Sequence, residues 1–143
     1  MFANQEATIV QRLKDTMPEG VYVGTLDELE KVVEMRQRAP AVWVIYDGYI
    51  VQASPNPASK VVLLRQDWFV VVATKSAKGS GTAAVAKNEA SALALTALGA
   101  LIGYPLGEGK YLQVSDAPGP EYDAGYCHVP LAFASAATFK ATN

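Results

Sequence analysis

The residue pair with the most chemical potential is Cys127-His128, which holds the only cysteine and the only histidine of the 143-residue chain. A cysteine nucleophile needs a base within hydrogen-bonding reach. The stretch 126–133 is typical of a β-strand, in which neighbouring side chains point to opposite faces, so we expect no Cys–His dyad. No G-x-S-x-G elbow marks a serine for a Ser–His–Asp triad. One cysteine and one histidine also cannot form a Cys/His zinc site or an internal disulfide.

A glycine-containing loop, KSAKGSGT at residues 75–82, precedes a predicted helix and could suggest a phosphate-binding loop. It lacks the G-x-x-x-x-G-K-[ST] order, because Lys78 precedes both glycines, and a mobile connection is favoured. The region 60–87 is nevertheless basic, with one acidic residue, Asp67, against Lys60, Arg65, Lys75, Lys78 and Lys87. This bias suits either a solvated face or a phosphate or acidic partner.

Acidic residues gather in one later loop, at Asp116, Glu121 and Asp123. Their spacing does not follow the ligand pattern of an EF-hand, and no carboxylate pair marks a glycosidase. The sequence therefore predicts no catalytic residue, no metal site and no cofactor.

Aromatic side chains form the other candidate site, since Trp43, Tyr46, Tyr49, Trp68 and Phe69 all lie in two long predicted strands. Such a cluster is found in cores. With few charges to cover it, the cluster is also typical of an obligate subunit interface. Both interpretations stay open from the sequence.

The elements that must position these residues begin with two helices and a short strand. Apolar residues at spacings of three and four predict a helix over 5–17, and a strand is expected at 21–23. Thr25 and Glu28 form a capping box that opens a second helix, ending near Met35. Its outer side carries acidic residues, among them Asp27, Glu30 and Glu34.

Two long strands are predicted next, over 40–51 and 60–75, because both stretches are dense in β-branched and aromatic residues. We expect a bulge at Asp47-Gly48 and the chain reversal at 54–57. The second strand is apolar on both faces, which favours helices on one face and a second subunit on the other.

The last elements are an alanine-rich helix over 83–102, capped by Gly103, and a hairpin of strands 111–114 and 126–133. The tail from Ala134 to Asn143 is small and polar and is expected to fray. The apolar stretch 91–102 spans about 18 Å as a helix, too little for a bilayer core of about 30 Å.

Composition favours one soluble domain spanning 1–143. Half of the residues are apolar, 18% are charged, and the net charge is −2, which argues against disorder and against a basic nucleic-acid coat. No secretory signal is predicted at the N-terminus. The predicted fold class is α+β, a mainly antiparallel sheet of about four to five strands with helices packed on one face.

The chain resembles the tail-terminator, or tail-completion, proteins of long-tailed bacteriophages, and more closely a Mu-like prophage group. The resemblance covers essentially the whole sequence. It is carried by ATIVQRLKDTMP, VYVGTLDELEKV, PAVWVIYDGYIV, QDWFVVVATKSAKG, GALIGYPLGEG and YCHVPLAFASAATF.

This resemblance implies a non-enzymatic virion protein, assembled in the host cytoplasm, that caps the head-proximal end of the tail tube as a homohexameric ring. Implied partners are further copies of the chain, the tube protein, the sheath protein and the head connector, with DNA passing only through the channel and no membrane involved. A ring closes by heterologous contacts. The residues expected at subunit contacts or facing the channel are Asp27, Glu30, Glu34, Lys75, Lys78, Lys87, Trp43 and Trp68.

Three other functions compete with this one. A head–tail joining protein would bind the portal side rather than the tube end. A small-molecule-binding or enzymatic domain, with the aromatic hairpin as a pocket wall, would be stabilised by its ligand. A phosphate or nucleic-acid binder using Lys75, Lys78 and Lys87 would bind weakly and with a steep salt dependence.

Overall fold

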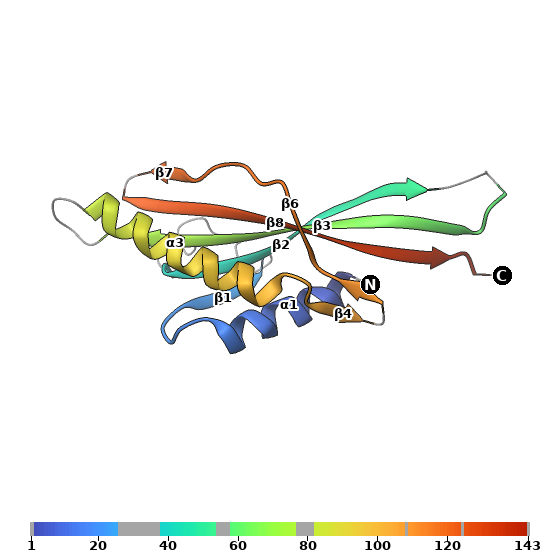
Figure 1. The fold of residues 1–143 in the computed structure, drawn as a ribbon, viewed down its shortest axis with the longest axis horizontal. Helices are drawn as coiled ribbons and strands as arrows, with labels where there is room; N and C mark the ends of the chain where they lie inside the picture. The colour runs from blue at the N-terminus through green and yellow to red at the C-terminus, as the bar shows by residue number, and fades with distance from the viewer. Residues whose placement is uncertain are drawn as a thin grey trace.

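The computed structural model describes residues 2–25, 38–53, 58–76, 82–107, 109–123 and 125–142. Two helices, α1 (Phe2–Thr16) and α3 (Thr82–Leu101), accompany a set of strands along one elongated body (Figure 1). The strands are β1 (Tyr22–Thr25), β2 (Ala41–Ala53), β3 (Val61–Lys75), β4 (Pro105–Gly107), β5 (Lys110–Tyr111), β6 (Gln113–Ser115), β7 (Glu121–Asp123) and β8 (Tyr126–Lys140).

Six of these strands form one sheet in the order β1-β2-β3-β8-β6, with β7 also paired to β8, and β4-β5 form a separate pair. Among the described strands of this sheet, β1 and β2 run parallel and the other pairings are antiparallel. The α+β class with a mainly antiparallel sheet is confirmed. The expected four to five strands were too few, because the stretch after α3 contributes several strands of two or three residues.

β2 and β3 lie where the sequence predicted two long strands, and the reversal predicted at 54–57 lies outside the described residues. The register moves from Tyr46 opposite Trp68 to Tyr49 opposite Gln66, so an irregularity falls at Asp47-Gly48. Gly48 has a φ of 96°, a conformation that side chains with a Cβ adopt only at a cost. The predicted bulge is therefore present. It changes which residues of β2 share a face with the even-numbered residues of β3.

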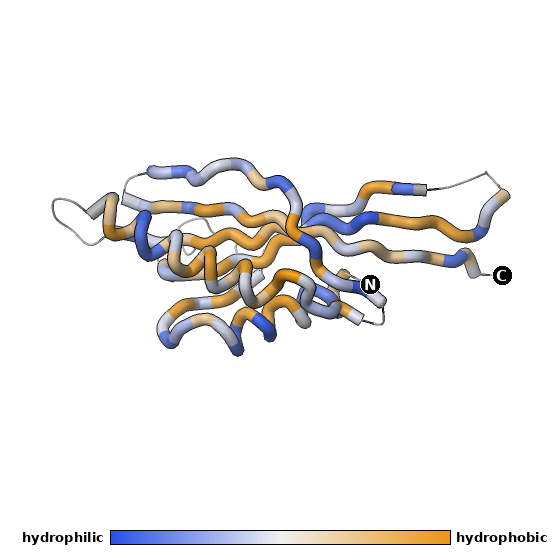
Figure 2. The backbone as a smooth tube through the Cα atoms, viewed as in Figure 1, coloured by the Kyte–Doolittle hydropathy of each residue, from blue (hydrophilic) through white to orange (hydrophobic). Residues whose placement is uncertain are grey.

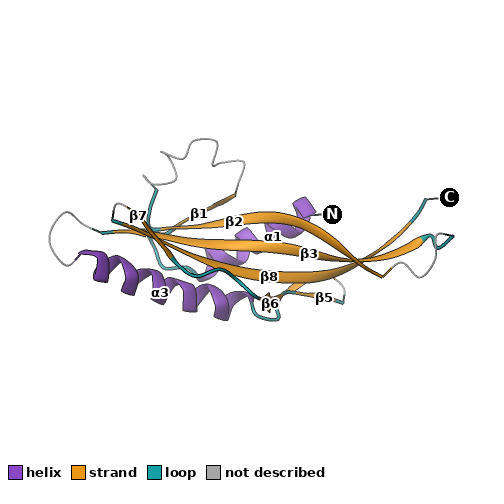
Figure 3. Cartoon of the chain, turned by 90° about the horizontal axis from the view of Figure 1, so that it is seen from above, coloured by secondary structure: helices purple, strands orange, loops and turns teal. Residues whose placement is uncertain are grey.

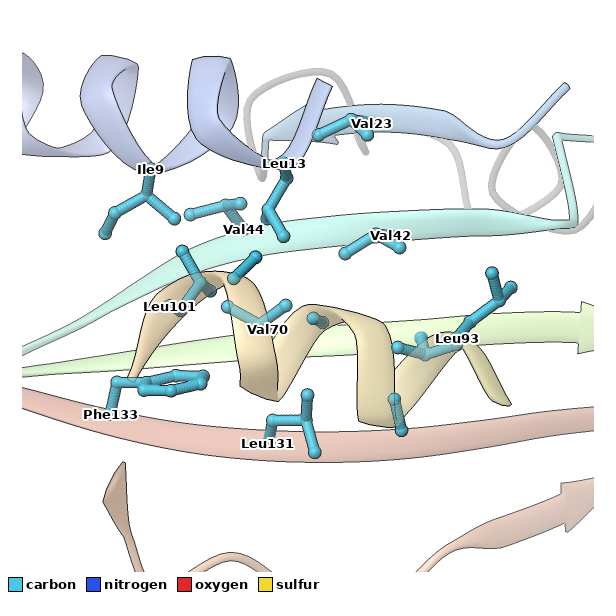
Figure 4. Close-up of a cluster of buried hydrophobic side chains, with 14 of the residues drawn as sticks. Ile9, Leu13, Val23, Val42, Val44, Val70, Leu93, Leu101, Leu131 and Phe133 are labelled. Carbon is cyan, nitrogen blue, oxygen red and sulfur yellow. The ribbon is translucent and has the colours of Figure 1, made fainter. Parts of the chain in front are cut away.

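The core lies where both described helices meet alternate residues of the three long strands (Figure 4). Ile9 and Leu13, four residues apart on α1, are fully buried against it. Alanines on α3 let this helix approach closely, and the hydroxyl of Thr74 on β3 donates a hydrogen bond of 2.7 Å to the carbonyl of Ala86. The sheet contributes Val42, Val44, Trp68, Val70, Val72, Leu131 and Phe133.

The C-terminal tail is a correction to the sequence analysis. Residues 134–140 do not fray, because β8 continues to Lys140 and pairs with β3 along its whole length. The pattern of small residues gave little sign of a strand. The first half of β3 has backbone groups that need a second partner, and this segment supplies it.

The helix predicted to end near Met35 lies outside the described residues. Gly103 follows α3 with a φ of 69°, as expected for a helix C-terminal cap. Among the described helices, none is long and apolar enough to span a membrane.

Candidate assembly interface

The three long strands continue past both helices as a narrow extension of the sheet (Figures 1 and 3). We call this extension the arm and define it as residues 49–53 of β2, 61–66 of β3 and 135–140 of β8, which lie opposite one another in register. The helices cover mainly the other half of the sheet, and α1 reaches only the root of the arm. One face of the arm is partly covered by the chain itself, because Leu64, Gln66, Ser135 and Ala137 are buried, whereas Ala136 and Thr138 on the other face are exposed.

Apolar side chains are exposed on the arm. Tyr49, Ile50 and Val51 are 57%, 49% and 54% exposed, and Val61 at the start of β3 is 40% exposed. Successive residues of a strand point to opposite faces, so three exposed residues in a row mean that β2 exposes side chains on both faces at this edge of the sheet. Figure 2 shows hydrophobic colouring continuing into this end of the sheet. Contiguous exposed apolar surface of this kind marks interaction sites.

A buried polar network fixes α1 at the root of the arm. Gln66, which is fully buried, donates a hydrogen bond from Nε2 to Oε1 of Gln5 at 2.6 Å. The Tyr46 hydroxyl donates to Oε1 of Gln66 at 3.1 Å. The ring of Tyr46 also stacks on Phe2, with centroids 4.7 Å apart. These contacts hold the strands in place where the arm leaves the body.

Burial at the root of the arm changes the pKa of the Tyr46 hydroxyl. Removal of water raises the pKa of the Tyr46 hydroxyl, and the nearby Tyr49 and Asp67 raise this pKa further. Tyr46 is therefore a neutral hydrogen-bond donor across the physiological range.

The face of the sheet opposite the network holds a partly open cavity of about 290 Å³. Arg65 and Asp67 form an ion pair at its wall, with Nε and Oδ1 3.0 Å apart. Asp47 and Asp116 add two further carboxylates, and Phe69 is the aromatic residue of the wall on this face. Trp68 and Phe133 also border the cavity, but their side chains are buried in the helix-side core. No group of histidine, cysteine and carboxylate ligands that could hold a metal ion occurs within the described ranges.

The structure places Cys127 and His128 on opposite sides of the sheet. Cys127 is buried in the helix-side core cluster, whereas His128 is half-buried and lies opposite Ala73. The expectation that these two side chains cannot form a dyad is confirmed.

The residues predicted to form subunit contacts are dispersed. Lys75 and Lys87 are exposed, at the end of β3 and on α3. Trp68 is buried under the helices, and Trp43 is buried on the other face beside Tyr22, with ring centroids 5.3 Å apart. The chain itself covers both indoles, so the candidate interface at the arm is formed by other residues. Asp27, Glu30, Glu34 and Lys78 lie outside the described residues.

Sequence comparison decides the family. A profile described as phage tail terminator protein matches residues 2–143. The chain belongs to the phage tail terminator family. A search of curated proteins found no match. Membership makes this chain a structural protein of the phage tail, as the resemblance implied, and the Mu-like subgroup stays a prediction.

For a tail terminator, the feature that the sequence analysis missed is the arm. Its signal was present in Val61–Leu64, an apolar run in the strand for which we predicted helices on one face and a second subunit on the other. The expected fraying of residues 134–143 concealed the third strand. The Gln5–Gln66 contact joins residues 61 positions apart, so no local pattern could reveal it.

Proposed function

We propose that this tail terminator caps the head-proximal end of the tail tube as a homohexameric ring. The ring stops tube growth and presents the surface to which the head attaches. The family match across residues 2–143 carries the proposal. The exposed apolar arm supports it, because a subunit that is to be covered by neighbours needs such surface.

In this function the partners are further copies of the chain, the tube protein, the head connector and, in a contractile tail, the sheath protein. The protein belongs to the head-proximal end of the virion tail after assembly in the host cytoplasm. DNA meets it only in the channel.

Charge pairing between neighbours is part of the proposal. The acidic residues Asp27, Glu30 and Glu34 would face the basic region of the next subunit, which contains Lys75, Lys78 and Lys87. Complementary charge favours correct orientation during encounter. Changing Glu30 and Glu34 together to Lys should weaken assembly, and unchanged assembly would remove this element from the proposal.

The deciding experiment has two stages. Light scattering over a concentration series should give a mass of about 91 kDa, six times the 15.2 kDa of one chain. Purified tube protein is then polymerised with and without the terminator, and tube lengths are measured by electron microscopy. Shorter tubes with the protein at one end support the proposal. Tubes of unchanged length that bind no terminator contradict it, and binding only to the head connector would indicate a joining protein.

A further inference from the structure

The arm has two unpaired edges within the part of the chain that the structure describes. On the β2 side, β1 pairs only with residues 41–44, so residues 45–53 have no outer partner. On the β8 side, β6 pairs with residues 132–134, and no described strand pairs with the outer side of 135–140, although β5 lies near it, with Nζ of Lys110 6.0 Å from the ring centroid of Phe139. An open strand edge presents N–H and C=O groups that can template pairing with another chain.

These edges have little of the protection that monomeric sheets use. Natural sheets block their edges with charged residues, prolines or bulges. From Tyr49 to Ala53 and from Ser135 to Phe139 the edges contain no charged residue and no proline. The bulge at Asp47-Gly48 lies within the unpaired stretch 45–53, at the root of the arm, and a second irregularity falls between Val51 and Ala53. Edges left open in this way are suited to pairing.

We propose that the β2 edge of one arm pairs with the β8 edge of the arm of the next copy. This inference rests on the ring of the proposed function and names the contact that closes it. The sheet then continues from subunit to subunit, and the apolar residues Tyr49, Ile50 and Val51 become covered at the junction.

A second copy is the occupant that fits both edges at once. The two edges lie at the same level of the arm, since Ile50 is opposite Arg65 and Arg65 is opposite Ala136. Both are five or six residues long. A partner of another kind would need only one edge, whereas a heterologous contact between copies uses two different ones.

The direction of the strands sets the geometry of the junction. β2 and β8 are each antiparallel to β3, so they run parallel to each other. Rotation about a ring axis preserves this direction, and each junction is therefore a parallel strand pair. Three strands from each of six copies give a closed sheet of eighteen, and barrels of about 16–18 strands enclose an open channel.

Cysteine cross-linking tests the junction. Ile50 and Ala136 share a face and are exposed, but within one chain they are two strand spacings apart, about 10 Å. A disulfide requires Cα atoms within about 7 Å, so a bond between Ile50→Cys and Ala136→Cys must join two copies. Thr138→Cys, on the same face, tests a register shifted by two residues.

The chain with both cysteines should form a ladder of covalent species up to six chains on a non-reducing gel. A mixture of chains carrying one cysteine each should stop at dimers. Ala136→Cys combined with Leu95→Cys, on the exposed side of α3, is the matched control and should give no ladder. The unsubstituted chain controls for the buried Cys127.

The outcomes separate this inference from the proposed function. Rings of six chains that form no cross-link in either register overturn the edge junction and leave the ring intact. Absence of rings both in solution and on tube ends overturns the proposed function, and the junction with it.

In a parallel measurement, Val51→Lys should reduce ring formation at least tenfold, whereas Val85→Lys on α3 should not. A ring that persists with Val51→Lys but no longer binds tubes would assign the edge to the tube protein instead.

Discussion

At the scale of single residues, Gln66 is the side chain with the most unusual position, a fully buried amide in the middle of a long strand. A buried polar group that loses its partner costs more than the hydrogen bond contributed, because it has also given up its water. The contact with Gln5 therefore selects one placement of α1 on the sheet. It also fixes the point at which the helix layer ends and the arm begins.

We predict that Gln5→Leu lowers the free energy of unfolding by about 1–3 kcal/mol, since it leaves Nε2 of Gln66 buried without an acceptor. The double variant with Gln66→Leu should be more stable than the sum of the two single effects predicts, because no orphaned amide remains. Urea denaturation of the four proteins measures this coupling. Strictly additive effects would show that the two amides do not depend on each other.

The buried thiol of Cys127 gives a prediction about pH. Burial raises the pKa of this thiol, and Lys87 offsets part of the rise. Above about pH 9 the unfolded chain releases the thiol proton before the folded chain does, so stability falls as pH rises. Denaturation midpoints of the natural chain should decline between pH 8 and 10 more steeply than those of Cys127→Ala. Parallel declines in the two proteins would contradict this prediction.

At the scale of elements, the strongly patterned segments were predictable and the arm was not. The spacing of Ile9 and Leu13 located α1, and the β-branched runs located β2 and β3. The second half of β8 is made of small residues whose strand conformation comes from pairing with Val61–Gln66 rather than from their own propensity. The candidate interface depends on that pairing and therefore required the structure.

The positive φ of Gly48 at the bulge gives a prediction about stability. Gly48 has a φ of 96° with no atom near the position of an added Cβ, so Gly48→Ala meets backbone strain alone. We expect a loss of about 1–2 kcal/mol of stability. Gly99→Ala, in the interior of α3 and equally unobstructed, should instead stabilise by about 1 kcal/mol. Thermal unfolding compares the two variants with the natural chain. Equal effects at both positions would contradict the prediction that an added Cβ strains the backbone at Gly48.

At the scale of the whole molecule, the helix-covered part of the sheet, which we call the body, differs from the arm in what covers it. The body contains the core, with Leu13, Trp68 and Leu101 buried between helices and sheet. The arm adds length to three strands without adding helices to cover them, as Figure 3 shows. If neighbouring copies cover this extension in the proposed ring, we expect its exposed residues to affect assembly more than folding of the single chain.

The two contacts proposed between subunits should respond differently to salt, and this gives the last prediction. Charge pairs between exposed residues are screened as the Debye length falls from about 10 Å at 0.1 M to about 3 Å at 1 M. Backbone pairing and apolar burial at the arm are not weakened in this way, and sulfate strengthens burial. If the arm edges carry most of the association energy, the ring mass measured by light scattering should persist in 1 M sodium chloride and extend to lower protein concentration in sodium sulfate.

Dissociation of the ring at 1 M sodium chloride, while circular dichroism shows the chains still folded, would assign the association to the charge pairs instead. The rate of assembly supplies the control for this experiment, because steering by the basic region should make assembly slower at high salt even where the final mass is unchanged.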